Sequence, residues 1–188
     1  MSVAVLCESN LHGMLLAALL APEQARGEVE VRVVEGLSSG FSFARTRLAV
    51  RRLPVAVVID AESPEPEAAL ERKHRTEEII GDASGGVPYH VAVAIPELEI
   101  LYFEIPDLIR RTFGAVDEHT LELARLSPRR AIARLAPHEE LVHACFRLVR
   151  ALEGADIDAI RATDLIRELI DFVQSAGQSS RRPIVSNA

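Results

Sequence analysis

The chain has 188 residues, of which 48% are hydrophobic and 26% are charged. This composition is typical of one packed domain, or of one domain with an appendage, and it excludes a disordered, collagen-like or disulfide-rich protein. The net charge of −7 and the 4% aromatic content argue against a broad cationic or base-stacking surface for nucleic acid. No apolar stretch approaches the ~20 residues of a membrane span and the first residues lack a basic leader, so we expect a cytoplasmic protein without membrane contact.

The first 95 residues alternate between short apolar runs and longer helical patterns. The apolar runs are rich in β-branched residues and predict strands over residues 3–7, 29–34, 54–59 and 90–95. Three helical patterns between them are long enough for crossover helices and span residues 11–20, 42–53 and 65–80. This order predicts an α/β fold with a parallel sheet of about four strands, flanking helices and all carboxyl strand ends at one edge, where a site is expected.

After Pro96 the strand signals stop, and the rest of the chain has helical spacing. The helical segments are residues 97–103, 107–113, 118–126, 128–135, 139–152 and 158–173. One of them carries an apolar stripe that must pack on the α/β part or on a second copy of the chain, formed by Leu141, Cys145, Leu148 and Leu152. We therefore expect an α/β domain over 1–114, a helical C-terminal appendage over 115–178 and a flexible tail over 179–188.

Acidic residues follow three of the four predicted strands. Glu8 follows the first, Asp60 and Glu62 follow the third, and Glu97 and Glu99 follow the fourth. In a parallel sheet these positions converge on one edge, where clustered carboxylates repel one another unless a cation compensates them. Mg²⁺ or Mn²⁺ prefers such ligands and also accepts phosphate oxygens, so the pattern points to phosphodiester chemistry. Neutralising Asp60 should then spare or slightly stabilise the metal-free fold. The alternative is that each acid merely occupies a loop or a helix N-terminus.

Basic residues and one histidine offer further candidates. Arg45 and Arg52 lie seven residues apart in the 42–53 pattern, so they should share a helix face that could bind a DNA backbone, unless that face is simply solvated. A second group that follows Pro128 could form a local positive stripe and comprises Arg129, Arg130 and Arg134. His12 lies one turn after Glu8 and could donate a proton, assist a metal or be an ordinary packed histidine.

Three segments together resemble the Toprim fold: VAVLCESNLHGMLLAALL, VAVVIDAES and VAIPELEILYF. They are similar to small bacterial Toprim-like proteins and to the Toprim module of the overcoming-lysogenization-defect nucleases, over residues 3 to 104. In this family a glutamate ends the first strand, an Asp-x-Asp ends the third, and a Pro-Glu-x-Glu segment often follows the fourth. The resemblance matches Glu8 to the first glutamate, Asp60 and Glu62 to the Asp-x-Asp pair, and Glu97 and Glu99 to the late acidic pair.

The resemblance implies a Mg²⁺- or Mn²⁺-dependent nuclease, a hydrolase that acts on nucleic acid, on DNA rather than RNA, in bacterial defence or repair. Glu8 and Asp60 would be the catalytic residues, with Glu8 as general base or metal ligand. The implied metal ligands are Glu8, Asp60, Glu62, Glu97 and Glu99, and the implied contacts to nucleic acid are Arg45 and Arg52.

The sequence departs from the family pattern near the first and third strands. Ser9 and His12 stand near the places where the family usually has Gly and Asp, and Glu62 replaces the second Asp of the Asp-x-Asp pair. These departures keep open a non-catalytic interaction or effector subunit that works with a separate ATPase. A homo-oligomer through the C-terminal helices is a further alternative.

Overall fold

The computed structural model describes residues 2–179, and they form a four-stranded sheet in the order β2-β1-β3-β4. The strands are β1 (Val3–Cys7), β2 (Val29–Val33), β3 (Val55–Asp60) and β4 (Tyr89–Ala94). All three pairings are parallel, and the register places Asp60 opposite Ala94 at the carboxyl edge. The predicted parallel sheet of four strands is confirmed.

Helices follow each of the first three strands and then make up the rest of the chain. Those within the α/β part are α1 (Asn10–Leu19), α2 (Ala21–Ala25), α3 (Gly36–Ala49) and α4 (Pro66–Gly81). The later ones are α5 (Ile100–Phe103), α6 (Pro106–Phe113), α7 (Glu118–Leu126), α8 (Pro128–Leu135), α9 (Leu141–Ala151), α10 (Gly154–Arg161) and α11 (Asp164–Ser179). None of the helices within residues 2–179 is long and apolar enough to cross a membrane.

The prediction of a helix over residues 42–53 is wrong in position. Helix α3 begins six residues earlier, at Gly36, and ends at Ala49, so Arg52 lies beyond it with a φ of 55°. The early start is possible because Gly40 faces Val34 so closely that a Cβ there would lie 2.9 Å from the valine Cγ2. Glycine thus serves close packing inside a helix here, rather than a turn.

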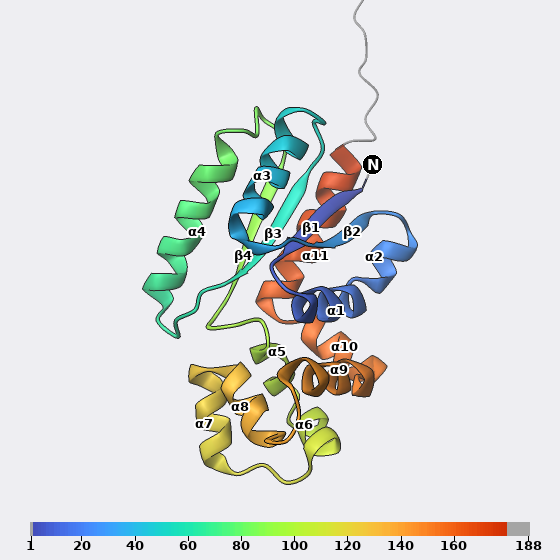
Figure 1. The fold of residues 1–188 in the computed structure, drawn as a ribbon. Coiled ribbons are helices and arrows are strands. Elements are labelled where there is room, and N and C mark those ends of the chain that lie inside the picture. Colours follow the sequence, from blue (N-terminus) through green and yellow to red (C-terminus); the bar gives the residue numbers. More distant parts are fainter. Residues whose placement is uncertain (1, 180–188) are drawn as a thin grey trace, which may run out of the picture.

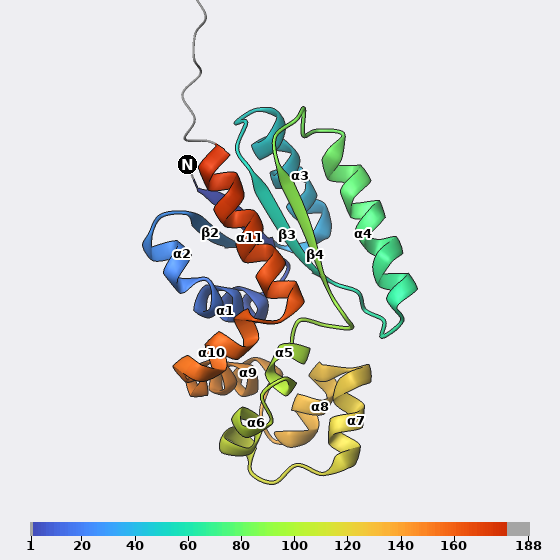
Figure 2. The ribbon, with the colours of Figure 1, turned by 180° about the vertical axis from the view of Figure 1, so that it is seen from behind.

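The sheet is covered on both faces (Figures 1 and 2). Helices α3 and α4 pack on one face, over a core that includes Leu6, Val57 and Ile59. Helices α1 and α11 lie on the other face, and α11 crosses the sheet in Figure 2. The buried side chains that α11 presents to the core are Ile166, Leu169, Ile170, Val173 and Ala176. The last helix is therefore part of the α/β architecture.

Helices α5 to α9 lie beyond the carboxyl edge of the strands (Figure 1). One continuous apolar core joins them to the sheet, since Cys145 and Leu148 of α9 belong to the same buried cluster as Leu15 and Leu16 of α1. The predicted stripe on α9 is thus covered inside the chain, and it does not need a second copy. The boundary at residue 114 stays a prediction, and the expected tail lies, except for Ser179, outside the described residues.

An ion pair joins α2 to α10. The Glu23 side chain is 1% exposed and accepts hydrogen bonds from both terminal nitrogens of Arg161, each at 2.9 Å. Hydrogen bonding from Arg161 lowers the pKa of the Glu23 carboxyl below its usual 4.5, despite burial, which acts in the opposite direction. The pair is therefore a stabilising link between the two halves of the chain.

We expect Glu23→Gln to lower the free energy of unfolding at pH 7 by about 2–3 kcal/mol, because it leaves Arg161 without its anionic partner. Since the folded-state pKa is depressed, the stabilisation is present above the unfolded value and is lost as the pH falls through the folded value. Urea unfolding at pH 7 and pH 3 should show the gap between the two proteins closing in acid. Glu71→Gln, in an exposed pair on α4, should change stability by less than about 0.5 kcal/mol. A gap of equal size at both pH values would contradict this assignment.

Candidate functional site

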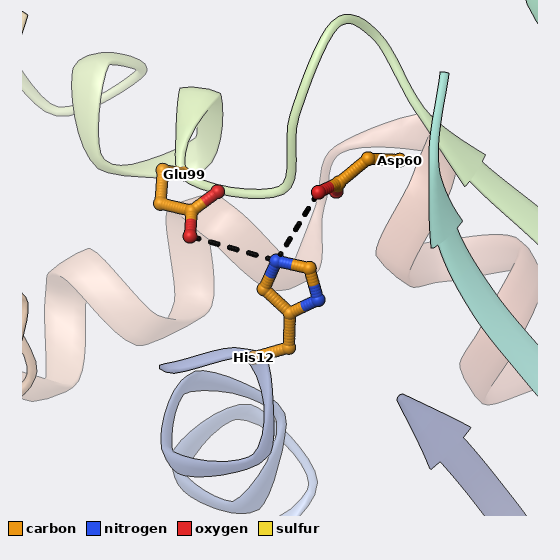
Figure 3. A group of neighbouring side chains, drawn as sticks. All are labelled: His12, Asp60 and Glu99. Atoms are coloured by element: carbon orange, nitrogen blue, oxygen red, sulfur yellow. Dashed lines mark ion pairs between the residues drawn. The ribbon is translucent and has the colours of Figure 1, made fainter. Parts of the chain in front are cut away.

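Three side chains from different elements point toward one another at the carboxyl edge of the sheet (Figure 3). His12 lies in the first turn of α1, where the Ser9 side chain caps the helix by accepting the His12 backbone N–H. Asp60 is the last residue of β3, and Glu99 directly precedes α5. The Leu98 N–H donates to Asp60 Oδ1 at 2.9 Å, which holds the segment before α5 against the end of β3.

The three side chains are close enough to share one cation. One ligand atom from each lies within 4.8 Å of the others, and all three residues are buried. His12 Nε2 lies 3.5 Å from both Asp60 Oδ2 and Glu99 Oε1. A nitrogen and two carboxylate oxygens in this arrangement could hold a divalent ion, and neutral imidazole is a common ligand alongside carboxylates.

A fourth side chain, Arg129, reaches the same group from the first turn of α8. Its Nη2 lies 2.6 Å from Asp60 Oδ2 and 2.8 Å from His12 Nε2, and its Nε donates to Glu99 Oε1 at 3.0 Å. The Arg129 side chain is 31% exposed. We call His12, Asp60, Glu99 and Arg129 the edge cluster. The guanidinium of Arg129 supplies the positive charge that the sequence pattern assigns to a metal.

Glu97 fixes the start of α8 rather than joining the edge cluster directly. Its Oε2 accepts the backbone N–H of Arg129 at 3.0 Å, and its Oε1 lies 3.8 Å from Arg129 Nη1. Ser127 occupies the N-cap position, but its side chain makes no capping hydrogen bond within the described part of the chain. A glutamate from the loop after β4 therefore caps the helix, which places the Arg129 side chain at the sheet edge.

Burial and charge act in opposite directions on the carboxyl groups of the edge cluster. Burial raises the pKa of Asp60, although His12 and Arg129 oppose this shift. Burial also acts to raise the pKa of Glu99, but its contacts with His12 and Arg129 outweigh burial and lower that pKa. The anionic form of Glu99 is thus firmly held, whereas Asp60 depends on a neighbouring cation to stay ionised.

His12 experiences opposing influences as well. Burial lowers its pKa, but the hydrogen bond to Glu99 and the charges of Asp60 and Glu99 raise it. Arg129 has only donors, however, so with Nη2 at 2.8 Å from Nε2 the histidine must accept. We take this contact as decisive: while Arg129 is in place, His12 is neutral and carries its proton on Nδ1. That atom is buried without a hydrogen-bond partner among residues 2–179.

Glu8 directly follows β1, and it lies outside the group of three ligand residues whose atoms come within 4.8 Å of one another. Burial raises the pKa of its carboxyl, the charge of Arg72 opposes this shift, and the charges of Asp60 and His12 also act on it. Glu8 Oε1 is buried and has no partner within the described residues, and the same holds for Glu99 Oε2. A buried carboxylate oxygen needs either a hydrogen-bond donor or a cation, and a bound divalent ion would supply the cation. The chemistry of these residues therefore fits a divalent ion.

The remaining predicted site residues lie elsewhere. Glu62 has a side chain that is 64% exposed, and it pairs with Arg72 at 2.7 Å. Arg45 is exposed on α3. Arg52 donates to the carbonyl oxygens of Ser84 and Gly85. The expectation that Arg45 and Arg52 share a helix face is wrong, because α3 ends before Arg52. Their contacts to nucleic acid and the ligand role of Glu62 stay predictions.

Comparison with solved structures identifies the fold. The C-terminal region of the OLD protein from Xanthomonas campestris pv. campestris aligns with a TM-score of 0.58 and 14% identity, over 95% of this chain and 96% of that one. The C-terminal region of the Burkholderia pseudomallei OLD protein gives a TM-score of 0.58 and 17% identity, over 93% and 98% of the two chains. The chain has the fold of the OLD C-terminal region. No protein-family model and no curated protein matches the sequence.

The OLD fold accounts for nearly the whole chain, including the helices after residue 104 to which the Toprim resemblance did not extend. The Toprim-like α/β fold predicted from three short motifs is thereby confirmed as a fold. At these identities the likeness concerns architecture, so the chemistry of the edge cluster has to be argued from its own residues.

Proposed function

We propose that the edge cluster and Glu8 form a metal-dependent phosphodiesterase site that acts on nucleic acid, with Mg²⁺ or Mn²⁺ as the cofactor. The observation that carries this proposal is the group of buried ligand atoms that His12, Asp60 and Glu99 hold within 4.8 Å of one another. Buried carboxylate oxygens of Glu8 and Glu99 that have no hydrogen-bond partner among residues 2–179 add to it. The OLD fold supports it, because the sequence motifs that resemble the Toprim module of the overcoming-lysogenization-defect nucleases lie at this same sheet edge in a chain with that architecture.

Each residue has a distinct part in this proposal. Asp60 and Glu99 would hold the ion, with His12 as a nitrogen ligand and Glu8 completing the site through its free oxygen. When bound, the ion supplies a Lewis acid that polarises a phosphoryl oxygen and balances developing negative charge. Glu8 has a pKa raised by burial, so its carboxylate is suited to accept a proton from an attacking water. We propose DNA rather than RNA as the substrate, in defence or repair.

A second candidate function is favoured by one observation. Arg129 already places a positive charge against Asp60 and Glu99, so the acidic edge can remain folded without any metal. A non-catalytic interaction subunit that works with a separate ATPase would need no more than this. Metal binding separates the two functions, because the enzyme requires it and the subunit does not.

The test compares the wild-type protein with Glu8→Gln. We expect wild type to bind Mn²⁺ and to cut DNA in its presence, and Glu8→Gln to lose at least about 100-fold in cutting rate, since a ligand charge and a proton acceptor are both removed. The free energy of unfolding should be unchanged or slightly higher, because a neutral amide costs less to bury than a carboxylate.

The measurements are Mn²⁺ titration calorimetry and cleavage of single-stranded, duplex and nicked DNA, with RNA in parallel. Glu35→Gln, an exposed substitution before α3, is the matched control and should behave as wild type. Wild-type protein that neither binds Mn²⁺ nor cuts any substrate would favour the interaction subunit instead.

A further inference from the structure

The Arg129 guanidinium contacts the same atoms that would ligate a metal. The three ligand atoms that lie within 4.8 Å of one another belong to His12, Asp60 and Glu99. Arg129 nitrogens lie 2.6–3.0 Å from His12 Nε2, Asp60 Oδ2 and Glu99 Oε1. A divalent ion of this class sits ~2.1–2.2 Å from its ligands and would repel a guanidinium held this close.

We propose that Arg129 is a built-in competitor of the metal, so that the edge cluster exists in two mutually exclusive states. In one state the guanidinium compensates Asp60 and Glu99, and in the other a divalent ion takes its place. This inference rests on the proposed function, and it concerns the regulation of that same site. The protein would thus be closed to metal by one of its own side chains.

The structure provides a route out for the guanidinium. The Arg129 side chain is 31% exposed, whereas the side chains of Asp60 and Glu99 are almost fully buried. Glu97 is already close, with its Oε1 3.8 Å from Arg129 Nη1, and it also accepts the Arg129 backbone N–H. Arg129 can therefore turn from the edge cluster toward Glu97 and solvent while α8 keeps its cap and its position.

The exchange also explains why the metal-free acidic edge is stable. Two buried carboxylates next to each other repel strongly unless a cation is present. Arg129 supplies the positive charge whenever no metal is bound, and the guanidinium suits this role because it stays protonated and offers several donors in one plane. An incoming ion must displace these contacts. Its apparent association constant therefore equals the intrinsic constant multiplied by the fraction of molecules in which Arg129 has left the edge cluster.

The experiment is a Mn²⁺ titration of wild type, Arg129→Ala and Arg129→Gln, followed by calorimetry and by electron paramagnetic resonance of free Mn²⁺. We expect Arg129→Ala to bind Mn²⁺ at least about tenfold more tightly than wild type, which corresponds to a wild-type site that is about 90% closed. The control is Arg130→Ala, which removes an exposed arginine one residue along α8 and should bind as wild type.

Thermal melts provide a second readout. In EDTA, Arg129→Ala should melt several degrees below wild type, and saturating Mn²⁺ should raise its melting temperature by more than it raises that of wild type. If Arg129→Ala does not fold without metal, Arg129→Gln keeps most of the volume and two donors, and it should show the same shifts to a smaller extent.

The outcomes separate the competition from the proposed function. Equal Mn²⁺ affinity in wild type and both Arg129 variants would overturn the competition and leave the metal site standing. A lower affinity in both variants would also overturn it, since Arg129 would then assist binding. Absence of binding in every protein would overturn the proposed function itself, and with it the competition.

Discussion

Asp60→Asn is expected to abolish Mn²⁺ binding and Mn²⁺-dependent cleavage, and to lower the free energy of unfolding in EDTA by about 2–3 kcal/mol. The carboxylate uses both oxygens: Oδ1 accepts the Leu98 N–H at 2.9 Å, and Oδ2 accepts from Arg129 at 2.6 Å. An asparagine has one acceptor oxygen, so its amide NH₂ would face a donor at one of the two positions. Both the ligand charge and one buried hydrogen bond are lost.

This expectation reverses the sign that the sequence alone predicts for stability. From the sequence, clustered carboxylates only repel, and neutralising one of them should spare or stabilise the metal-free fold. The structure adds Arg129, which makes Asp60 one half of a largely buried ion pair. Urea unfolding in EDTA at pH 7 decides between the two, with the exposed Asp107→Asn as the matched control. An Asp60→Asn protein as stable as wild type would show that Arg129 does not compensate Asp60 in solution.

A chain ended at residue 114 is expected not to fold cooperatively. It would lack α11, which covers one face of the sheet and contacts β1 and β4. Four large side chains of α11 are buried there, namely Ile166, Leu169, Ile170 and Val173. At about 1.5–3 kcal/mol for each, their burial contributes on the order of 6–12 kcal/mol, which is comparable to the whole stability of a typical domain.

The comparison needs the full chain and a chain that ends at residue 179 as controls. Both retain all the packing of the described residues, so both should show one cooperative transition in urea and strong amide protection in β1 and β3. The 1–114 chain should show neither. A cooperative transition in the 1–114 chain would establish the α/β domain predicted from the sequence as an independent folding unit.

The sequence predicts most of the fold because strand burial leaves a simple signature. Strands buried on both faces read as continuous apolar runs, and β1 was predicted at its observed bounds. Helices α7 and α8 are also predicted at their observed bounds, and α8 begins where Pro128 takes the first helical position after Ser127.

Two helical predictions failed for physical reasons that periodicity does not show. The start of α3, residues 36–40, contains two glycines and two serines, which locally favour a turn, yet these residues are helical and Gly40 packs closely against Val34. The predicted helix over 158–173 is two helices, α10 and α11, separated by Ala162 and Thr163. Apolar spacing continues across that break because both helices present a face to the same core.

The site was predicted in part. Asp60 and Glu99 stood out because acids that follow parallel strands must meet at one edge, and the structure brings both together. For His12 the sequence leaves three roles open, since a histidine in a helix has no distinctive spacing. From the sequence, Arg129 stands out only as one of three arginines that could form a local positive stripe. The one available signal was the need of buried acids for a cation, which does not say where in the sequence that cation lies.

The residues of the edge cluster lie far apart in the sequence, and this affects folding during synthesis on the ribosome. His12 and Arg129 are 117 residues apart in sequence, and Asp60 and Arg129 are 69 residues apart. At a synthesis rate of about 5–20 residues per second, the arginine emerges roughly 6–23 s after the histidine. Contacts that close such long loops form late in folding. Any translation product that stops before α8 therefore carries the acids of the sheet edge without their arginine, together with a sheet whose second face is uncovered, which makes it a natural target for chaperones and proteases.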